Sequence, residues 1–183
     1  MRFSQTKIPG VVVIDPELRE DQRGFFARTF CREEFKANGL VDHIEQGSLS
    51  FNLRRGTMRG MHVQVAPHTE TKVVACVEGS IFDVTLDTRR TSPTFGQWFG
   101  IDLSAQNRRM VYLPAGVAHG FQTLVDASTV LYQISSGFYP QAARGIRWDD
   151  PTIDIAWPIR DNIVISDQDR TWPPWPPPSE ELA

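Results

Sequence analysis

Short runs of β-branched and aromatic residues, separated by clusters of turn residues, recur along most of this chain. The clearest run is Ser80–Asp87, where hydrophobic and polar residues alternate with the period of two that places successive side chains on opposite faces of a strand. The other strand candidates are Val11–Ile14, Gln97–Leu103, Met110–Leu113, Val117–Leu124 and Ser128–Ile134. Strands this short, joined by turns rather than helices, favour a sandwich or barrel over a parallel sheet with crossover helices.

Only one helix is predicted before the C-terminal region, over Arg32–Ala37. These residues are helix formers, and Gly39 follows at the position of a C-terminal cap. From Trp172 onward the chain is rich in proline, which cannot extend a helix or join a sheet ladder, so residues 172–183 should form an extended tail. A length of 183 residues suits one well-buried domain, here residues 1–183, and is short for two.

The charge balance and the cysteines exclude several classes of protein. The chain carries 22 acidic and 19 basic residues, a net charge of −3, and no basic block, which argues against a nucleic-acid partner. No apolar run approaches the ~18–20 residues that cross a bilayer, and the first residues lack the apolar stretch of a signal peptide, so we expect no membrane partner. Cys31 and Cys76 are expected to be buried, reduced thiols, which indicates a cytoplasmic location.

Five side chains in four clusters could carry out chemistry. They are His62 with Lys72, then His119, Tyr132 and Asp169. Taken singly, each residue type in such a context is more often structural, because a strand histidine is usually a satisfied polar group and a tyrosine among apolar neighbours usually belongs to the core. Together, a histidine, a carboxylate, a lysine and a tyrosine are the components of a proton-transfer site.

Eight sequence motifs occur in the same order as in one known family. They are Asp21–Phe26, Arg59–His62, Phe82–Arg89, Ser92–Gly96, Ala118–Phe121, Trp148–Pro151, Ile155–Pro158 and Ser166–Asp169. From about residue 8 to residue 172, the chain resembles the dTDP-4-dehydrorhamnose 3,5-epimerase family. The resemblance implies a mostly β fold, a cupin-type antiparallel double-sheet jelly roll with a few short peripheral helices. It also implies a homodimer that works without a cofactor.

The resemblance assigns catalytic roles to four residues. His62 becomes the general base, Asp169 its hydrogen-bond partner, Tyr132 the general acid on the opposite face of the sugar, and Lys72 the group that stabilises the enolate oxygen. These roles suit the chemistry, because a proton beside a ketone is weakly acidic and its removal needs a positioned base and stabilisation of the developing oxyanion. Inversion then requires a proton from the other face.

The resemblance also implies a set of substrate-binding positions. They are Arg23, Phe26, Arg28, Gln46, Asn52, Arg59, His119 and Phe138. Arg23 and Phe26 are expected to reach across the dimer. Two positions depart from the family: Arg28 stands where a glutamate usually contacts thymine, and Phe138 where a second tyrosine is common. A guanidinium has only donors and cannot repeat a carboxylate's contact, so the base of the nucleotide stays open.

The expected function is epimerisation at C3 and C5 of a nucleoside-diphosphate 4-keto-6-deoxyhexose, as in the conversion of dTDP-4-dehydro-6-deoxy-D-glucose to dTDP-4-dehydro-L-rhamnose. One alternative is a single-carbon epimerase, acting at C3 or C5 only, on a related sugar nucleotide. A non-catalytic sugar-nucleotide-binding protein and a metal-dependent cupin enzyme are further alternatives. Many cupins bind a metal through a His-x-His motif, and His62-Val63-Gln64 lacks the second histidine, so no metal is expected.

Overall fold

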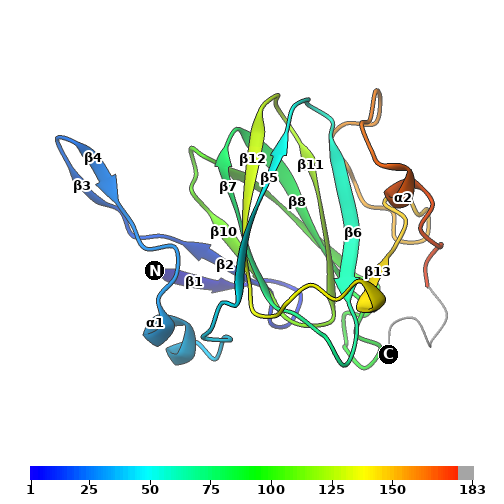
Figure 1. Ribbon diagram of the computed structural model, residues 1–183, viewed down its shortest axis with the longest axis horizontal. Helices are drawn as coiled ribbons and strands as arrows, with labels where there is room; N and C mark the ends of the chain where they lie inside the picture. The colour runs from blue at the N-terminus through cyan, green and yellow to red at the C-terminus, as the bar shows by residue number, and fades with distance from the viewer. Residues whose placement is uncertain (177–183) are drawn as a thin grey trace.

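The structure is a computed structural model that describes residues 1–176, and its core consists of two facing antiparallel sheets (Figure 1). The first sheet has the order β1 (Arg2–Gln5), β2 (Val12–Asp15), β10 (Met110–Leu113), β7 (Lys72–Glu78), β12 (Ser128–Ile134) and β5 (Gln46–Asn52). The second has the order β13 (Ala143–Gly145), β6 (Met58–Gln64), β11 (Val117–Thr123), β8 (Ser80–Asp87) and β9 (Trp98–Ser104). This arrangement confirms the predicted double-sheet fold.

Outside the sheets lie a small hairpin and three short helical segments. The hairpin consists of β3 (Arg19–Asp21) and β4 (Gly24–Phe26), and it projects from one end of the molecule (Figure 1). The helical segments are α1 (Arg32–Ala37), the 3₁₀ turn η1 (Pro140–Ala142) and α2 (Asp167–Arg170). The α1 helix agrees with its prediction, and Gly39 follows it with a φ of 70°, a backbone conformation that glycine adopts without strain.

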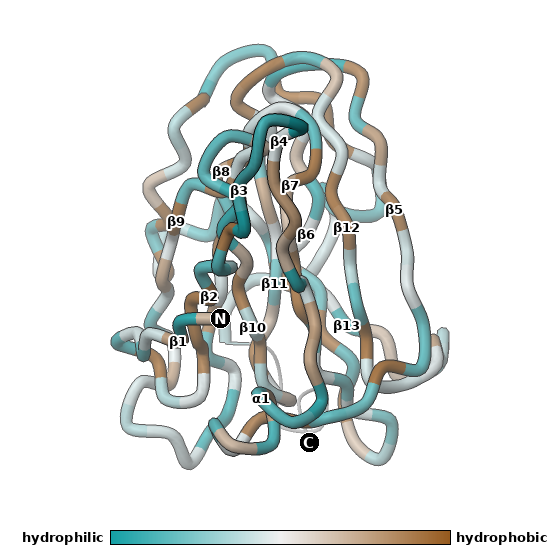
Figure 2. Tube along the Cα trace, turned by 90° about the vertical axis from the view of Figure 1, so that its left-hand side faces the viewer, coloured by the Kyte–Doolittle hydropathy of each residue, from teal (hydrophilic) through white to brown (hydrophobic). Residues whose placement is uncertain are grey.

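The apolar residues form three clusters, one between the sheets and one on the outer face of each. Hydrophobic stretches lie along the strands of both sheets, whereas the turn between β3 and β4 is hydrophilic (Figure 2). Between the sheets, Val74 and Val130 of the first sheet pack with Ile81 and Phe121 of the second. On the outer face of the first sheet, Phe35 of α1 is buried against the strands. These clusters account for the alternating pattern, because each strand has one face against the interior and another against an outer layer.

Strand β8 shows how this arrangement shapes the site. Its hydrophobic face, with Val84 and Leu86, points outward and is covered by the C-terminal segment around Trp157. Its polar face therefore points between the sheets, where Asp83 and Thr85 are fully buried. A carboxylate in a protein interior needs partners, so the interior of this barrel contains a polar region.

Both cysteines are free thiols. Cys76 is buried as expected, and burial raises the pKa of its thiol to about 11. Cys31, in contrast to the prediction, is only partly buried, because it immediately precedes the exposed start of α1. Within the described residues, no helix combines the length and hydrophobicity that a membrane crossing requires.

The tail is a strap over residues 172–176, and the rest of the predicted tail lies outside the described residues. Trp175 stacks at a tilt on Phe95, with ring centroids 4.9 Å apart, and its backbone N–H donates to Asp150 Oδ2 at 2.8 Å. The backbone N–H of Arg147 donates to the carbonyl of Pro173. The strap thus holds the C-terminal segment against the second sheet.

We predict that protonation of Asp87 lowers the free energy of unfolding at acidic pH. Burial alone would raise the pKa of its carboxyl group, but hydrogen bonds from Arg89, Ser92 and Thr94 outweigh burial and lower the pKa to about 2. A folded-state pKa below the unfolded value stabilises the fold above the unfolded pKa of ~3.9, and this contribution is lost as pH falls toward 2. It should amount to about 2 kcal/mol.

The free energy of unfolding, measured by urea titration from pH 6 to pH 2, tests this. Asp87→Asn should be less stable than the wild type at pH 6 and should lose less stability on acidification. Asp161→Asn, at an exposed position, serves as the control. Parallel pH curves for the wild type and Asp87→Asn would contradict the prediction.

Candidate active site

A cavity of about 350 Å³ opens between the two sheets, next to α2. Its polar lining residues are Gln46, Ser48, His62, Gln64, Glu70, Lys72, Arg144 and Gln168. Its apolar lining residues are Val63, Ile134, Phe138, Ala143 and Trp172. Four of the residues predicted from the sequence therefore line one cavity, namely His62, Lys72, Gln46 and Phe138.

His62 and Asp169 form a hydrogen-bonded pair at the wall of this cavity. The two atoms, His62 Nε2 and Asp169 Oδ1, are 2.5 Å apart, as the sequence analysis expected of these residues. His62 lies on β6 and exposes 43% of its side chain, whereas only 8% of the Asp169 side chain is exposed. The imidazole is thus open to a ligand while the carboxylate behind it is shielded from water.

The short helix α2 positions Asp169 against β6 (Figure 1). Ser166 caps the helix, because its Oγ accepts the backbone N–H of Asp169 at 3.1 Å. Burial alone would raise the pKa of Asp169, but donation from His62, from the Trp172 indole and from the Gly60 N–H lowers it below its usual range. The carboxylate is therefore charged at neutral pH.

Lys72 pairs with Glu70 on the same side of the cavity. Lys72 Nζ lies 2.7 Å from Glu70 Oε1, and the two side chains are 15% and 9% exposed. Gln64 Nε2 donates to the other oxygen of Glu70 at 3.0 Å. The ion pair holds the ammonium group in place while leaving N–H donors for a ligand.

A second histidine–carboxylate pair lies deeper between the sheets. His119 Nε2 is 2.7 Å from Asp83 Oδ2, and His119 is the cross-strand partner of His62. Asp83 is fully buried, and its other oxygen, Oδ1, has no hydrogen-bond partner. The two imidazoles thus lie on neighbouring strands, each with its own carboxylate.

Glycines allow the strands of these histidines to approach each other closely. A Cβ atom at Gly60 would lie 2.6 Å from the Cα of Gly120, and one at Gly120 would lie 2.6 Å from Met61 Sδ. Neither separation is possible for real side chains, so both positions require glycine. The sequence motifs around His62 and His119 therefore have a packing role as well as a chemical one.

Tyr132 adjoins the cavity without lining it. Its ring is partly buried against the apolar cluster between the sheets and lies edge-on to His119, with ring centroids 6.0 Å apart. Its cross-strand neighbour Ser48, and Ile134 on the same face of β12, do line the cavity. Burial, and then the negative charge of Asp83, raise the pKa of the Tyr132 phenol against the opposing effect of Arg59, so the hydroxyl keeps its proton.

Comparison with known proteins identifies the family to which this site belongs. A family model described as dTDP-4-dehydrorhamnose 3,5-epimerase matches residues 5–176. The chain belongs to the dTDP-4-dehydrorhamnose 3,5-epimerase family.

Individual relatives are similar over nearly their whole length. The dTDP-4-dehydrorhamnose 3,5-epimerase of Methanothermobacter thermautotrophicus is 41% identical over 175 residues, which cover 94% of each chain. The crystal structure of the enzyme of that name from Elizabethkingia anophelis matches with a TM-score of 0.93 at 30% identity, covering 100% of this chain and 99% of that one. A 3′-monoepimerase from Streptomyces bikiniensis, in complex with dTDP-quinovose, matches with a TM-score of 0.87 at 33% identity, covering 92% and 85% of the chains.

Two further residues expected from the epimerase family lie side by side at the inner side of the edge strand β5. Arg59 Nε donates to Asn52 Oδ1 at 2.8 Å. The Asn52 amide is buried and donates to the backbone carbonyl of Ser128 at 3.1 Å. Asn52 thus fixes the direction of the Arg59 guanidinium.

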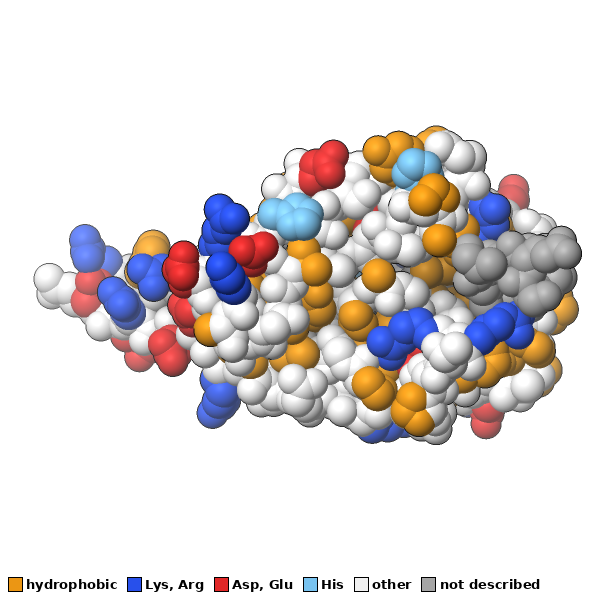
Figure 3. Space-filling view, turned by 90° about the horizontal axis from the view of Figure 1, so that it is seen from below, with side chains coloured by type: hydrophobic (Ala, Val, Ile, Leu, Met, Phe, Trp, Pro, Cys, Tyr) orange, Lys and Arg blue, Asp and Glu red, His pale blue; other side chains and the backbone are white. Residues whose placement is uncertain are grey.

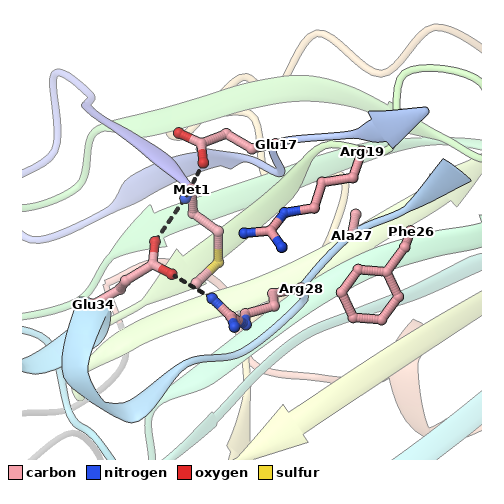
Figure 4. A pocket seen from close by; sticks show the side chains of 7 residues that line it. All are labelled: Met1, Glu17, Arg19, Phe26, Ala27, Arg28 and Glu34. Carbon is pink, nitrogen blue, oxygen red and sulfur yellow. Dashed lines mark hydrogen bonds and ion pairs between the residues drawn. The ribbon is translucent and has the colours of Figure 1, made fainter. Parts of the chain in front are cut away.

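The three remaining epimerase-family positions lie on or just after the β3–β4 hairpin and do not line the cavity. Charged side chains of both signs gather at the end of the molecule from which this hairpin projects (Figure 3). Arg23 pairs with Asp21 at 2.6 Å, and 86% of its side chain is exposed. Phe26 and Arg28 line a small pocket of about 30 Å³ at the base of the hairpin (Figure 4). There Arg28 lies 3.9 Å from Glu34, which also binds the N-terminal amine of the chain. A single chain does not bring these residues to the cavity.

Sequence reasoning assigned no role to several residues of the site, among them Glu70, Asp83 and Trp172. The alternating pattern of Ser80–Asp87 was a usable signal for Asp83. If the polar face of that strand points inward, the Asp83 carboxylate must have a partner in the interior. Within residues 1–176, no three histidine, cysteine or acidic side chains lie close enough to hold a metal ion. The expectation that the site works without a metal stays a prediction.

Proposed function

We propose that this chain inverts C3 and C5 of a nucleoside-diphosphate 4-keto-6-deoxyhexose by removing and returning protons. The observation that carries the proposal is the hydrogen-bonded pair of His62 and Asp169 at 2.5 Å, open on one side to a cavity that also contains Lys72. Membership of the epimerase family supports the same reaction.

The first step is removal of a proton next to the sugar ketone by His62. The charged Asp169 orients the imidazole and stabilises the imidazolium that forms. Negative charge develops on the ketone oxygen, and the ammonium group of Lys72 stabilises it in the partly buried cavity. Both groups line the same cavity, as a single enolate requires.

The second step is return of a proton to the opposite face of the ring. Tyr132 comes from β12, in the sheet opposite the β6 strand that carries His62, and its phenol stays protonated because burial and Asp83 raise its pKa. Inversion needs a base on one face of the ring and an acid on the other, and Tyr132 adjoins the cavity beside Ser48 and Ile134, which line it. We assign five further family positions in or near the cavity to binding of the substrate, namely Gln46, Asn52, Arg59, His119 and Phe138.

The nucleotide of the proposed substrate is a nucleoside diphosphate. The bound dTDP-quinovose of the Streptomyces bikiniensis relative supports a thymidine nucleotide. At position 28, however, this chain has an arginine where the family usually has the glutamate that contacts thymine. The proposal is therefore tested with a panel of 4-keto-6-deoxy sugars on thymidine, cytidine, guanosine and uridine diphosphates. Proton exchange with at least one of them is expected, and exchange with none would reject the function.

A single-carbon epimerase is the second candidate, favoured by the match to the 3′-monoepimerase. It is less well supported, because the curated relatives are named 3,5-epimerases. Incorporation of deuterium from solvent distinguishes the two. Uptake at both C3 and C5 supports the proposal, and uptake at only one carbon supports the alternative.

We further propose that the enzyme acts as a homodimer, as a cytoplasmic protein. The edge strand β5 and the residue after it expose three large apolar side chains, Leu49, Phe51 and Leu53, at 69%, 57% and 68%. Open edges and exposed apolar stripes are usually covered, and a second copy of the chain would do so. The family resemblance implies that Arg23 and Phe26 of one copy reach the cavity of the other.

We predict that Leu49→Asp combined with Phe51→Asp gives a monomer of reduced activity. Charges introduced on the stripe oppose its burial, and the loss of the partner's hairpin weakens substrate binding. Light scattering should report twice the chain mass for the wild type and one chain for the variant. Val164→Asp, at an exposed valine outside β5, is the control. A variant that stays dimeric, or a wild type that is monomeric and fully active, would reject this interface.

A further inference from the structure

The strap that follows α2 begins with a tryptophan that contacts the proposed base pair. Trp172 Nε1 lies 3.1 Å from Asp169 Oδ1, the same oxygen that pairs with His62. An indole N–H can only donate, so Oδ1 accepts this bond. The other carboxylate oxygen, Oδ2, accepts the backbone N–H of Gly60 at 3.3 Å. Asp169 therefore has three partners, and Trp172 is one that the family resemblance did not predict.

The indole occupies a place that the opposite strand leaves free for it. Gly145 on β13 is the cross-strand partner of His62. A Cβ atom at Gly145 would lie 2.1–2.3 Å from three atoms of the Trp172 indole, Nε1 among them. The indole also lies edge-on to the His62 ring, with centroids 6.3 Å apart, and lines the cavity. Its position is thus set by Gly145 on one side and Asp169 on the other.

We propose that Trp172 is a positioning residue that sets the pH at which His62 becomes free to accept the substrate proton. This inference rests on the proposed function, in which His62 is the base. The indole N–H fixes the direction of the Asp169 carboxylate and takes up part of the negative charge on Oδ1. Oδ1 therefore carries less negative charge toward the imidazole than it would if His62 were its only hydrogen-bond partner.

Removal of the indole N–H changes this balance in a predictable direction. More negative charge on Oδ1 favours the protonated imidazolium, so the neutral base appears only at higher pH. The other charged or titratable groups near the pair are Glu70, Lys72 and Arg144 in the cavity, Asp167 and Arg170 on α2, and the His119–Asp83 pair across from His62 on β11 and β8. They are the same in every variant below, so a shift between variants reports on the indole.

The first experiment is the pH dependence of kcat/KM for solvent exchange in Trp172→Phe. Phenylalanine keeps an aromatic ring at the cavity wall and removes the donor. The acid limb of the profile should move up by about one pH unit, as expected for loss of one hydrogen bond to a charged group. Exchange would then fall about tenfold on the acid side, with little change on the plateau. KM should stay close to the wild-type value.

Two further variants separate the hydrogen bond from packing. Gly145→Ala places a methyl group where the indole lies and should displace it, so the acid limb should move in the same direction. Trp175→Phe is the matched control, because it makes the same substitution in the same strap, and the contacts of Trp175 are with Phe95 and Asp150 rather than Asp169. Its profile should match that of the wild type.

Two outcomes would overturn the inference. An unchanged acid limb in Trp172→Phe would show that the bond does not act on the base. An equal loss at all pH values in Trp172→Phe and Trp175→Phe would show that the strap serves stability alone. Titration of the His62 ring protons by NMR, in wild type and Trp172→Phe without substrate, gives the same test without activity. A wild type that catalyses no exchange would reject the proposed function, whereas the NMR shift would still test Trp172.

Discussion

We expect His62→Ala to lose nearly all exchange of deuterium into both C3 and C5 of the substrate, because in the proposed mechanism every exchange begins with proton removal by this imidazole. A positioned base contributes about 10²–10⁴-fold to such a step, so the loss in kcat should lie in that range. Substrate binding should change far less, because His62 contacts the reacting proton rather than the nucleotide. The measurement is mass or NMR detection of deuterium in the sugar, with binding followed separately by calorimetry.

His43→Ala provides the control for this loss. His43 also carries an imidazole near the first sheet, where its Nε2 lies 3.0 Å from the Ser135 carbonyl, but it does not line the cavity. Its removal should leave exchange within a few-fold of the wild type. Full exchange in His62→Ala would reject the proposed mechanism, and equal losses in both variants would indicate a general effect on the fold.

Tyr132→Phe should separate exchange from inversion. The variant keeps the ring that packs beside His119 and removes the acidic hydroxyl, so the enolate still forms through His62 and Lys72. A proton can then return only from the face that it left. Deuterium should enter the sugar at near wild-type rates, while inversion at the carbon served by Tyr132 falls by about 10²-fold or more.

The test follows both quantities in one reaction, with deuterium content by mass spectrometry and configuration by proton NMR coupling constants. Tyr139→Phe is the matched control, since Tyr139 stacks on His68 with ring centroids 3.8 Å apart. Equal loss of exchange and inversion in Tyr132→Phe would contradict the role as acid. That result would mean that Tyr132 acts before the enolate or only maintains the packing of the cavity.

The strand pattern made six of the thirteen described strands predictable from the sequence. The six predicted strands appear with ends within one residue, because alternation and turn residues reflect local physics. Strand β5 was not predicted: its outward face is apolar and exposed at Leu49 and Phe51, whereas its inward face carries polar residues toward the cavity. This reversal agrees with the roles proposed for the two faces, and a rule that places apolar residues inside does not predict such a strand.

The site was predictable only where a family resemblance supplied partners far apart in the sequence. His62 and Asp169 are 107 residues apart, and no local pattern links them. Glu70 and Asp83 were missed because their roles depend on which side chains face them across the barrel. The hairpin residues Arg23 and Phe26 do not line the cavity of a single chain, so their roles remain predictions.

The polar inward face of β8 has a consequence for how the protein is made. Because the outer face of that strand must be covered by the segment around Trp157, the barrel is finished by residues that follow all of its strands. The carboxylate of Asp169 lies on this last segment. During translation at about 5–20 residues per second, His62 precedes its partner by roughly 5–20 seconds. An incompletely synthesised chain therefore contains His62 without Asp169. The His62–Asp169 pair can form only after the C-terminal segment has packed on the second sheet.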